Sequence, residues 1–146
     1  MQKMKATIQD LHNAAMNLSK GDLADLDAMQ AGRSPIEVFA KALDETTYAI
    51  KIDGKLLAVG GHSNGGIWFV TTILVGALSV GQKFRFYRIL KKHLFAIKNE
   101  SPDIQLSNWV SMGNRPHIRL LESLNATFEA GVSLSPSGRP FKKFWL

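Results

Sequence analysis

Residues 113–128, GNRPHIRLLESLNATF, predict a helix that begins at an asparagine and is followed by a strand. Asn114 stands where an N-cap is expected, and an asparagine there can accept a hydrogen bond from a backbone N–H of the first helical turn. Leu124, Asn125 and Ala126 form a stop before the strand. The asparagine either serves the helix alone or also holds a ligand at the helix start, and the surrounding sequence bears on this choice.

Length and composition indicate one folded domain over residues 1–146. The 45% hydrophobic and 21% charged residues are typical of a globular protein. The chain has no cysteine, which excludes disulfides, thiolate zinc sites and a cysteine nucleophile. The N-terminus lacks the apolar run of a secretory signal, and the longest nearly apolar run, residues 67–80, is too short to span a bilayer as a helix. We therefore expect no membrane segment.

Positive charge is concentrated in the later part of the chain. Residues 1–53 hold 6 lysines and arginines against 8 acidic residues, whereas residues 54–146 hold 12 against 4, and the net charge is +6. A surplus of this kind attracts nucleic acid, anionic lipid or a phosphorylated small ligand. Half of the later cations lie in a predicted long helix without one acid between them: Lys83, Arg85, Arg88, Lys91, Lys92 and Lys98.

Hydrophobic periodicity predicts the order helix, helix, three strands, helix, strand, helix, two strands. The first helix ends at Ala31 and Gly32, and the second opens at Ser34 with Glu37 placed for a capping box. The pair Asp53 and Gly54 is a strong hairpin signal. The predicted helices cover residues 7–30, 34–43, 79–99 and 114–124, and the predicted strands cover residues 46–52, 55–61, 67–72, 104–110, 126–132 and 141–146. This pattern predicts a mixed α/β (α+β) domain with a largely antiparallel central sheet and helices on both faces.

Three segments, DGKLLAVGG, IWFVTT and VSMGNRPHIRLLESLNATF, carry a family resemblance over roughly residues 48–128. In this order and spacing the chain resembles the GNAT superfamily (Gcn5-related N-acetyltransferases), in particular its small phage-encoded branch, the GNAT-like internal virion protein A family of short-tailed phages. The resemblance implies a GNAT-like domain that transfers an acyl group from acetyl-CoA or a longer acyl-CoA to an amine. We expect no metal cofactor.

The resemblance also implies where an acyl donor lies. Two neighbouring strands of such folds splay apart, and the backbone of the first pairs with the pantetheine arm in the gap. Here that gap lies between residues 67–72 and residues 106–110, and Asn114 caps its helix and hydrogen-bonds the arm. The donor residues implied are Phe69, Val70, Thr71 and Asn114 for the arm, and Ser79, Gly81, Gln82 and Lys83 near the phosphates.

Two departures from the family pattern bear on catalysis. The Arg/Gln-x-x-Gly-x-Gly/Ala phosphate motif is absent from residues 73–85, ILVGALSVGQKFR. Typical catalysts place a tyrosine seven residues after the asparagine, and this chain has Leu121 there, without an acidic base on residues 67–72 or 104–110. An active enzyme would then work by alignment of its reactants, and solvent, His117 or Ser111 would have to manage the protons.

The remaining histidines and aromatic residues are expected to be structural. His12 and His93 fill helix faces, and His62 sits in a solvated turn. Four histidines spread along the chain without matched carboxylates make a metal site improbable. Trp68, Phe69 and Trp109 are expected in the core, whereas Trp145, on the last strand, could equally line an interface such as that of a homodimer.

Two functions of different classes follow. The first is a phage-encoded acyltransferase that modifies an amine of a host protein or metabolite in the host cytoplasm. The second is a catalytically degenerate GNAT fold that binds another protein, either modulating a host enzyme or serving in the virion. Nucleic-acid binding through the basic helix is disfavoured, because the sequence has no recognisable reading helix or aromatic RNA platform.

Overall fold

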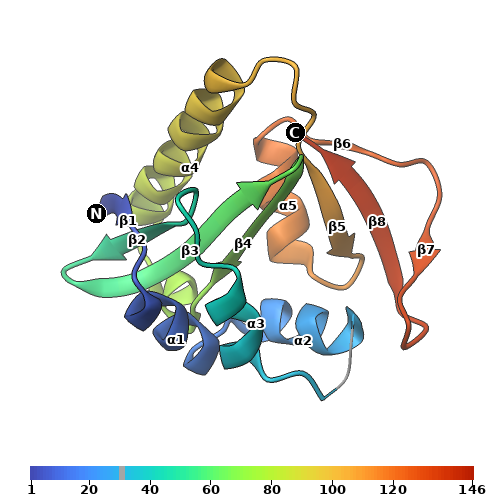
Figure 1. The fold of residues 1–146 in the computed structure, drawn as a ribbon, viewed down its shortest axis with the longest axis horizontal. Coiled ribbons are helices and arrows are strands. Elements are labelled where there is room, and N and C mark those ends of the chain that lie inside the picture. Colours follow the sequence, from blue (N-terminus) through green and yellow to red (C-terminus); the bar gives the residue numbers. More distant parts are fainter. Residues whose placement is uncertain (30–31) are drawn as a thin grey trace.

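A computed structural model describes residues 1–29 and 32–146, arranged as a twisted sheet between groups of helices (Figure 1). The sheet order is β1-β2-β3-β4-β5-β8-β6, with β7 also paired to β8. All neighbours are antiparallel except β4 and β5, which are parallel. The elements are β1 (Gln2–Lys5), α1 (Ile8–Met16), α2 (Lys20–Met29), α3 (Pro35–Lys41), β2 (Tyr48–Ile52), β3 (Lys55–Ser63), β4 (Gly66–Thr71), the 3-10 helix η1 (Ile73–Ala77), α4 (Val80–Glu100), β5 (Ser107–Ser111), α5 (Arg115–Ser123), β6 (Thr127–Phe128), β7 (Ser133–Leu134) and β8 (Pro140–Trp145).

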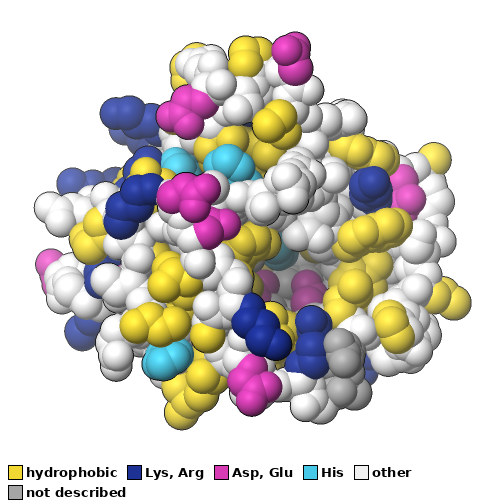
Figure 2. All heavy atoms as spheres, in the orientation of Figure 1, with side chains coloured by type: hydrophobic (Ala, Val, Ile, Leu, Met, Phe, Trp, Pro, Cys, Tyr) yellow, Lys and Arg dark blue, Asp and Glu magenta, His cyan; other side chains and the backbone are white. Residues whose placement is uncertain are grey.

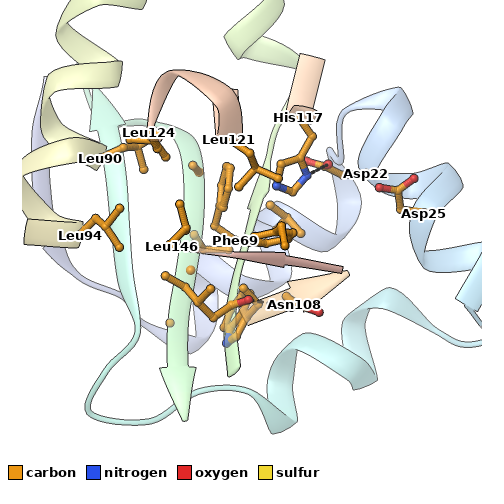
Figure 3. A pocket seen from close by; sticks show the side chains of 18 of the residues that line it. Asp22, Asp25, Phe69, Leu90, Leu94, Asn108, His117, Leu121, Leu124 and Leu146 are labelled. Atoms are coloured by element: carbon orange, nitrogen blue, oxygen red, sulfur yellow. Dashed lines mark hydrogen bonds and ion pairs between the residues drawn. The ribbon is translucent and has the colours of Figure 1, made fainter. Parts of the chain in front are cut away.

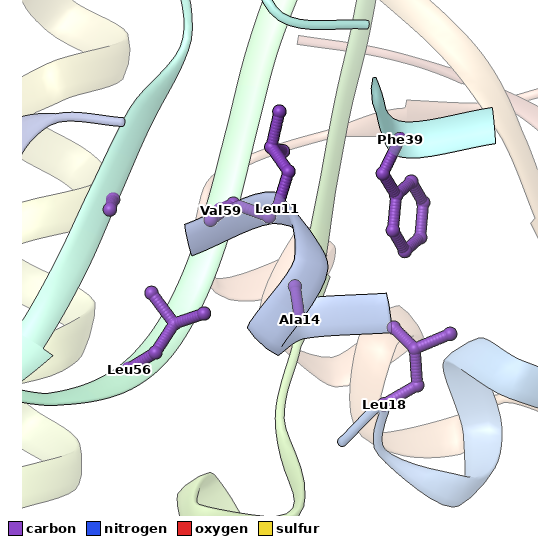
Figure 4. Packing of buried hydrophobic residues seen from close by; sticks show 7 residues of the cluster. Leu11, Ala14, Leu18, Phe39, Leu56 and Val59 are labelled. Carbon is purple, nitrogen blue, oxygen red and sulfur yellow. The ribbon is translucent and has the colours of Figure 1, made fainter. Parts of the chain in front are cut away.

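Helices cover both faces of the sheet, as the sequence predicts. On one face Leu11 of α1 and Phe39 of α3 pack with Leu56 and Val59 of β3 (Figure 4). On the other face Phe86 of α4 forms a cluster with Ile50, Leu57 and Ala58. A third cluster joins α5 to β5 and β8 through Leu121, Val110 and Phe144.

An irregularity in β3 explains why the adjacent residues Leu57 and Ala58 lie on the same face of the sheet. Ala58 stands opposite Ile50 and Leu56 opposite Lys51, so Leu57 is an extra residue between the two pairs. A bulge of this kind interrupts the strict alternation of a strand. Leu56 and Val59 consequently share one cluster, while Leu57 and Ala58 share the other.

The hairpin and the long helix follow the prediction closely. Asp53 and Gly54 both have positive φ, 49° and 75°, as the turn between β2 and β3 requires. Helix α4 starts after Ser79, whose side chain forms a capping box with Gln82. No helix in the described part of the chain is long and apolar enough to cross a membrane.

The N-terminal region differs from the prediction in three ways. Strand β1 was missed, and the first predicted helix is two helices, because residues 17–19 leave the helix and pair with residues 71–73, at the end of β4 and just after it. Ser34 precedes the helix as expected but makes no side-chain cap bond, so the predicted box with Glu37 is wrong. Of the two residues predicted to stop this helix, Ala31 and Gly32, Ala31 lies outside the described residues.

The C-terminal region and the aromatic residues also need correction. The predicted turn region before the last strand contains the short strand β7. Trp109 was expected in the core but is 40% exposed, because Val110 takes the buried side of β5. Trp68 and Phe69 are partly buried, and Trp68 stacks on Phe39 with ring centroids 6.3 Å apart.

Candidate binding cleft between β4 and β5

Strands β4 and β5 diverge from a single point of contact. Among residues 1–29 and 32–146, their ladder consists of Gly66 opposite Ser107, and the Ser107 N–H donates to the Gly65 carbonyl at 2.8 Å. The neighbouring β3–β4 ladder, by contrast, extends over six pairs. The gap predicted between these two strands is therefore present.

Side chains and backbone of the same chain already occupy much of the β4 edge that faces this gap. The Ile67 carbonyl accepts a hydrogen bond from Asn108 Nδ2 at 2.7 Å. The Thr71 N–H donates to Asp22 Oδ2 at 2.8 Å, and the Thr71 carbonyl accepts from the Ser19 N–H at 2.8 Å. Because hydrogen-bonding directions alternate along a strand, Phe69 is the gap-facing residue that lies between these two.

A cavity of about 240 Å³ occupies the gap. Figure 2 shows the molecule hollowed at this place, with acidic and histidine side chains at the bottom of the hollow. The walls are mostly apolar: Leu90 and Leu94 come from α4, and Leu124 from the end of α5. Figure 3 shows these leucines at one end of the cavity and the acidic residues of α2 at the other.

At its polar end the cavity is lined by Asp22 and Asp25 of α2 and His117 of α5, and Asn114, just before α5, contacts the two aspartates from behind the cavity wall. Asn114 Nδ2 donates to Asp22 Oδ1 at 3.0 Å and to Asp25 Oδ2 at 2.8 Å. His117 Nδ1 lies 3.6 Å from Asp22 Oδ1, and its ring meets Phe69 edge-on with centroids 4.7 Å apart. His117 Nε2 is buried without a hydrogen-bond partner among the described residues. The two carboxylates are thus bridged by one neutral amide.

These contacts shift the pKa values of the two carboxyl groups in opposite directions. Burial raises the pKa of Asp22, but His117 and the two Thr71 donors outweigh this and hold the pKa below its ordinary value of 3.8. Burial and the nearby Asp22 charge raise the pKa of Asp25 above its ordinary value of 3.8, and the hydrogen bond from Asn114 offsets them only in part. Asp22 is therefore the anion that organises the cluster, and Asp25 is the group that takes up a proton more readily.

The role predicted for Asn114 at its helix is wrong. Asn114 precedes α5, but its side chain makes no cap bond. It is 4% exposed and donates to the aspartates of α2 instead, and a Cβ added at Gly21 would lie 2.5 Å from its Oδ1. The hydrogen bonds of Asn114 thus connect the start of α5 to α2.

Other predicted site residues are distributed along the cleft or outside it. Ser111 is buried, and its Oγ accepts from the Gly113 N–H at 3.1 Å. The backbone of Val70 faces β3, where it stands opposite Val59. Leu121, at the place of the usual tyrosine, is fully buried and lines the cavity. The residues predicted near donor phosphates lie at the start of α4, and none of these described residues lines the cavity: Ser79, Gly81, Gln82 and Lys83.

Sequence reasoning missed Asp22, Asp25 and Asn108. The available signal was weak: two aspartates three residues apart in a predicted helix, and an asparagine within an apolar strand. The structure brings one donor atom each of Asp22, Asp25 and His117 within 4.8 Å of one another. Such oxygen and nitrogen donors can hold a divalent cation, although here Asn114 Nδ2 is directed between the carboxylates as a hydrogen-bond donor.

Comparison with solved structures identifies the fold. An acetyltransferase of the GNAT family from Bacillus anthracis superposes with a TM-score of 0.68 at 11% identity, covering 98% of this chain and 91% of that one. The ribosomal-protein-alanine N-acetyltransferase from Brucella melitensis gives 0.65 at 14% identity, and an N-acetyltransferase from Staphylococcus aureus Mu50 gives 0.64 at 9%, each over 100% of both chains. The protein has a GNAT acetyltransferase fold, as its sequence pattern indicates.

Sequence comparison places the chain within a phage family. Residues 46–132 match the family described as bacteriophage T7, probable scaffold protein Gp13. The probable scaffold protein gp13 of Escherichia phage T7 is 32% identical over 103 residues, covering 70% of each chain. The chain belongs to this family.

Proposed function

We propose that this protein is a phage particle-assembly protein that uses the GNAT fold to bind another protein and does not transfer acyl groups. One observation carries the proposal. On the gap-facing edge of β4, the Thr71 N–H donates a hydrogen bond to Asp22, and the Ile67 carbonyl accepts one from Asn108. The chain thus pairs backbone groups at both ends of the strand edge that an acyl donor would need, at Ile67 and at Thr71, so these ends are stable without a ligand.

The residues at the positions where catalytic groups were expected support the same function. Leu121 packs with Val110 and Phe144 in a core cluster and offers no proton to a leaving thiolate. The Ser111 hydroxyl accepts from the backbone of Gly113. The family to which the chain belongs is described as that of a probable scaffold protein. We place the protein in the assembling or finished particle, in contact with other particle proteins.

The test uses the phage that encodes the chain. Deleting the gene should lower the yield of infectious particles, and supplying the chain from a plasmid should restore it. A His117→Gln, Ser111→Ala double variant should restore the yield as well as the wild type does, because binding does not need these groups to move protons. Failure of this variant, in a folded form, to restore the yield would contradict the proposal, as would a deletion without effect.

Acyl-donor binding is a second candidate, and one observation favours it. Phe69 presents its backbone to the gap, and it lines the cavity. An acyl-CoA could pair there, and an amine at the polar end could attack the thioester carbonyl, forming the amide bond and passing its proton towards His117 or Asp25. The carbon–sulfur bond breaks, and CoA leaves as a thiolate that takes a proton from solvent. Calorimetric titration with acetyl-CoA tests this candidate. Micromolar binding that Lys83→Ala weakens would support it, and no heat at millimolar acetyl-CoA would exclude it.

A further inference from the structure

Helix α4 carries an exposed stripe on the side that faces away from the sheet. The side of α4 that packs against the rest of the protein carries its two buried residues, Phe86 and Ile97. On the opposite side three apolar residues remain in solvent: Val80 is 75% exposed, Phe84 63% and Phe95 66%. The residues between and beyond them on this side are exposed cations. We call the following six residues the outer stripe: Val80, Phe84, Arg88, Lys91, Phe95 and Lys98.

The spacing of the outer stripe suits contact with another helix. Successive members are four, four, three, four and three residues apart. Because an α-helix has about 3.6 residues per turn, this alternation keeps the six side chains on one line. From Val80 to Lys98 that line is about 27 Å long at about 1.5 Å per residue. Knobs at such spacing are what a second helix packs against.

The charge of α4 determines which kind of helix fits. The helix has six lysines and arginines, and its one acidic residue is Glu100 at the end. In the described part of the chain the ion pairs join Lys51 to Asp10 and His117 to Asp22, so neither involves α4. Arg88 stands three residues before Lys91 and four before Lys92, where like charges repel. Carboxylates of a partner would relieve this repulsion.

We propose that the outer stripe is the docking site for an acidic amphipathic helix of a partner protein. Apolar side chains of that helix would cover Val80, Phe84 and Phe95, and its glutamates or aspartates would meet Arg88, Lys91 and Lys98. The proposal rests on the protein-binding function above and adds the surface and the chemistry of the partner. A nucleic-acid duplex fits less well, because the two phenylalanines would face hydrated phosphates and gain nothing.

A synthetic peptide can test the surface directly. The probe is a fluorescent peptide of about 21 residues, long enough to cover the stripe as a helix, with leucines at three- and four-residue spacing and glutamates on the flanks. A matched peptide has lysine in place of every glutamate. Fluorescence anisotropy is measured against the full chain at about 50 and 300 mM salt, where charge screening differs.

The acidic peptide should bind the wild type, more weakly at the higher salt, and the lysine peptide should not. Phe84→Ser with Phe95→Ser should weaken binding at least about tenfold, and so should Arg88→Glu with Lys91→Glu. The charge-reversed variant should gain affinity for the lysine peptide. A matched control, Arg115→Glu with Arg119→Glu on α5, should bind as the wild type does, and circular dichroism should show that every variant keeps its helix content.

Three results would overturn the proposal: no binding of the acidic peptide, binding that neither stripe variant weakens, or tighter binding to a single-stranded oligonucleotide or to phosphatidylglycerol vesicles. The phage assay separates this failure from failure of the proposed function. If the folded Phe84→Ser, Phe95→Ser variant fully restores particle yield, the docking site is wrong while the assembly function stands. If deletion of the gene leaves the yield unchanged, the assembly function fails whatever the peptide does.

Discussion

Replacing Asp22 by asparagine should destabilise the protein and release the β4 edge. Asp22 Oδ2 accepts two hydrogen bonds from Thr71, from its N–H and its hydroxyl, both at 2.8 Å. Asp22 Oδ1 accepts a third from Asn114. An asparagine has one oxygen, so its amide must face either the Thr71 donors or the Asn114 donor. Hydrogen bonds to a charged acceptor contribute about 1.5–3 kcal/mol each, and we expect Asp22→Asn to lower the free energy of unfolding by about 2–4 kcal/mol at neutral pH.

The same change should alter the pH dependence of stability. Because the pKa of Asp22 is lower in the folded protein than its ordinary value of 3.8, the carboxylate stabilises the fold at pH values above that value. This contribution is lost as the pH falls through the folded pKa. The stability difference between wild type and Asp22→Asn should therefore be largest at neutral pH and shrink in acid.

Urea denaturation followed by tryptophan fluorescence measures both effects. Asp27→Asn is the matched control, since Asp27 lies in the same helix but is exposed, and it should change the free energy of unfolding by less than about 0.5 kcal/mol. The reasoning would be refuted by an Asp22→Asn variant as stable as the control. It would also be refuted by a difference that stays constant down to a pH well below 3.8.

Further expectations concern packing, backbone space and titration. Leu121→Ala should cost about 2–5 kcal/mol of unfolding free energy, since the side chain is fully buried; a loss below about 1 kcal/mol in urea denaturation would contradict its place in the core. Gly21→Ala should lower the melting temperature, because the new Cβ would lie 2.5 Å from Asn114 Oδ1, whereas Gly81→Ala, with open space around it, should be neutral or stabilising by up to about 1 kcal/mol. Burial and the nearby lysines Lys3 and Lys5, with His62, lower the pKa of His93 to about 4, so its ring signals in an NMR titration should stay those of neutral imidazole down to that pH; a midpoint near 6.5 would show that the ring is not held as described.

The sequence predicts those parts of the fold whose signals are local. The hairpin at Asp53 and Gly54 needs positive φ at both residues, and that requirement is visible in the residue types. The gap between β4 and β5 was implied by family resemblance and not by periodicity. Strand β1 could not be found, because QKMK has no strand pattern and becomes a strand only by pairing with β2.

The candidate cleft was predictable in place but not in chemistry. His117 was recognised because it follows Asn114 at the start of a helix. Asp22 and Asp25 resembled the solvated face of a helix, and only the packing of α2 against β4 and α5 buries them. The same packing takes the Asn114 side chain away from its own helix, since the buried carboxylate of Asp22 and the half-buried one of Asp25 need a donor more than the helix start needs a cap.

Mass spectrometry of purified particles and their precursors from the encoding phage tests the assembly function most directly. The account predicts that the chain co-purifies with precursor particles in a reproducible number of copies, and that particles made without it are fewer or lack other proteins. A chain that is absent from both precursors and particles, while deletion of its gene leaves their composition and number unchanged, would contradict the account.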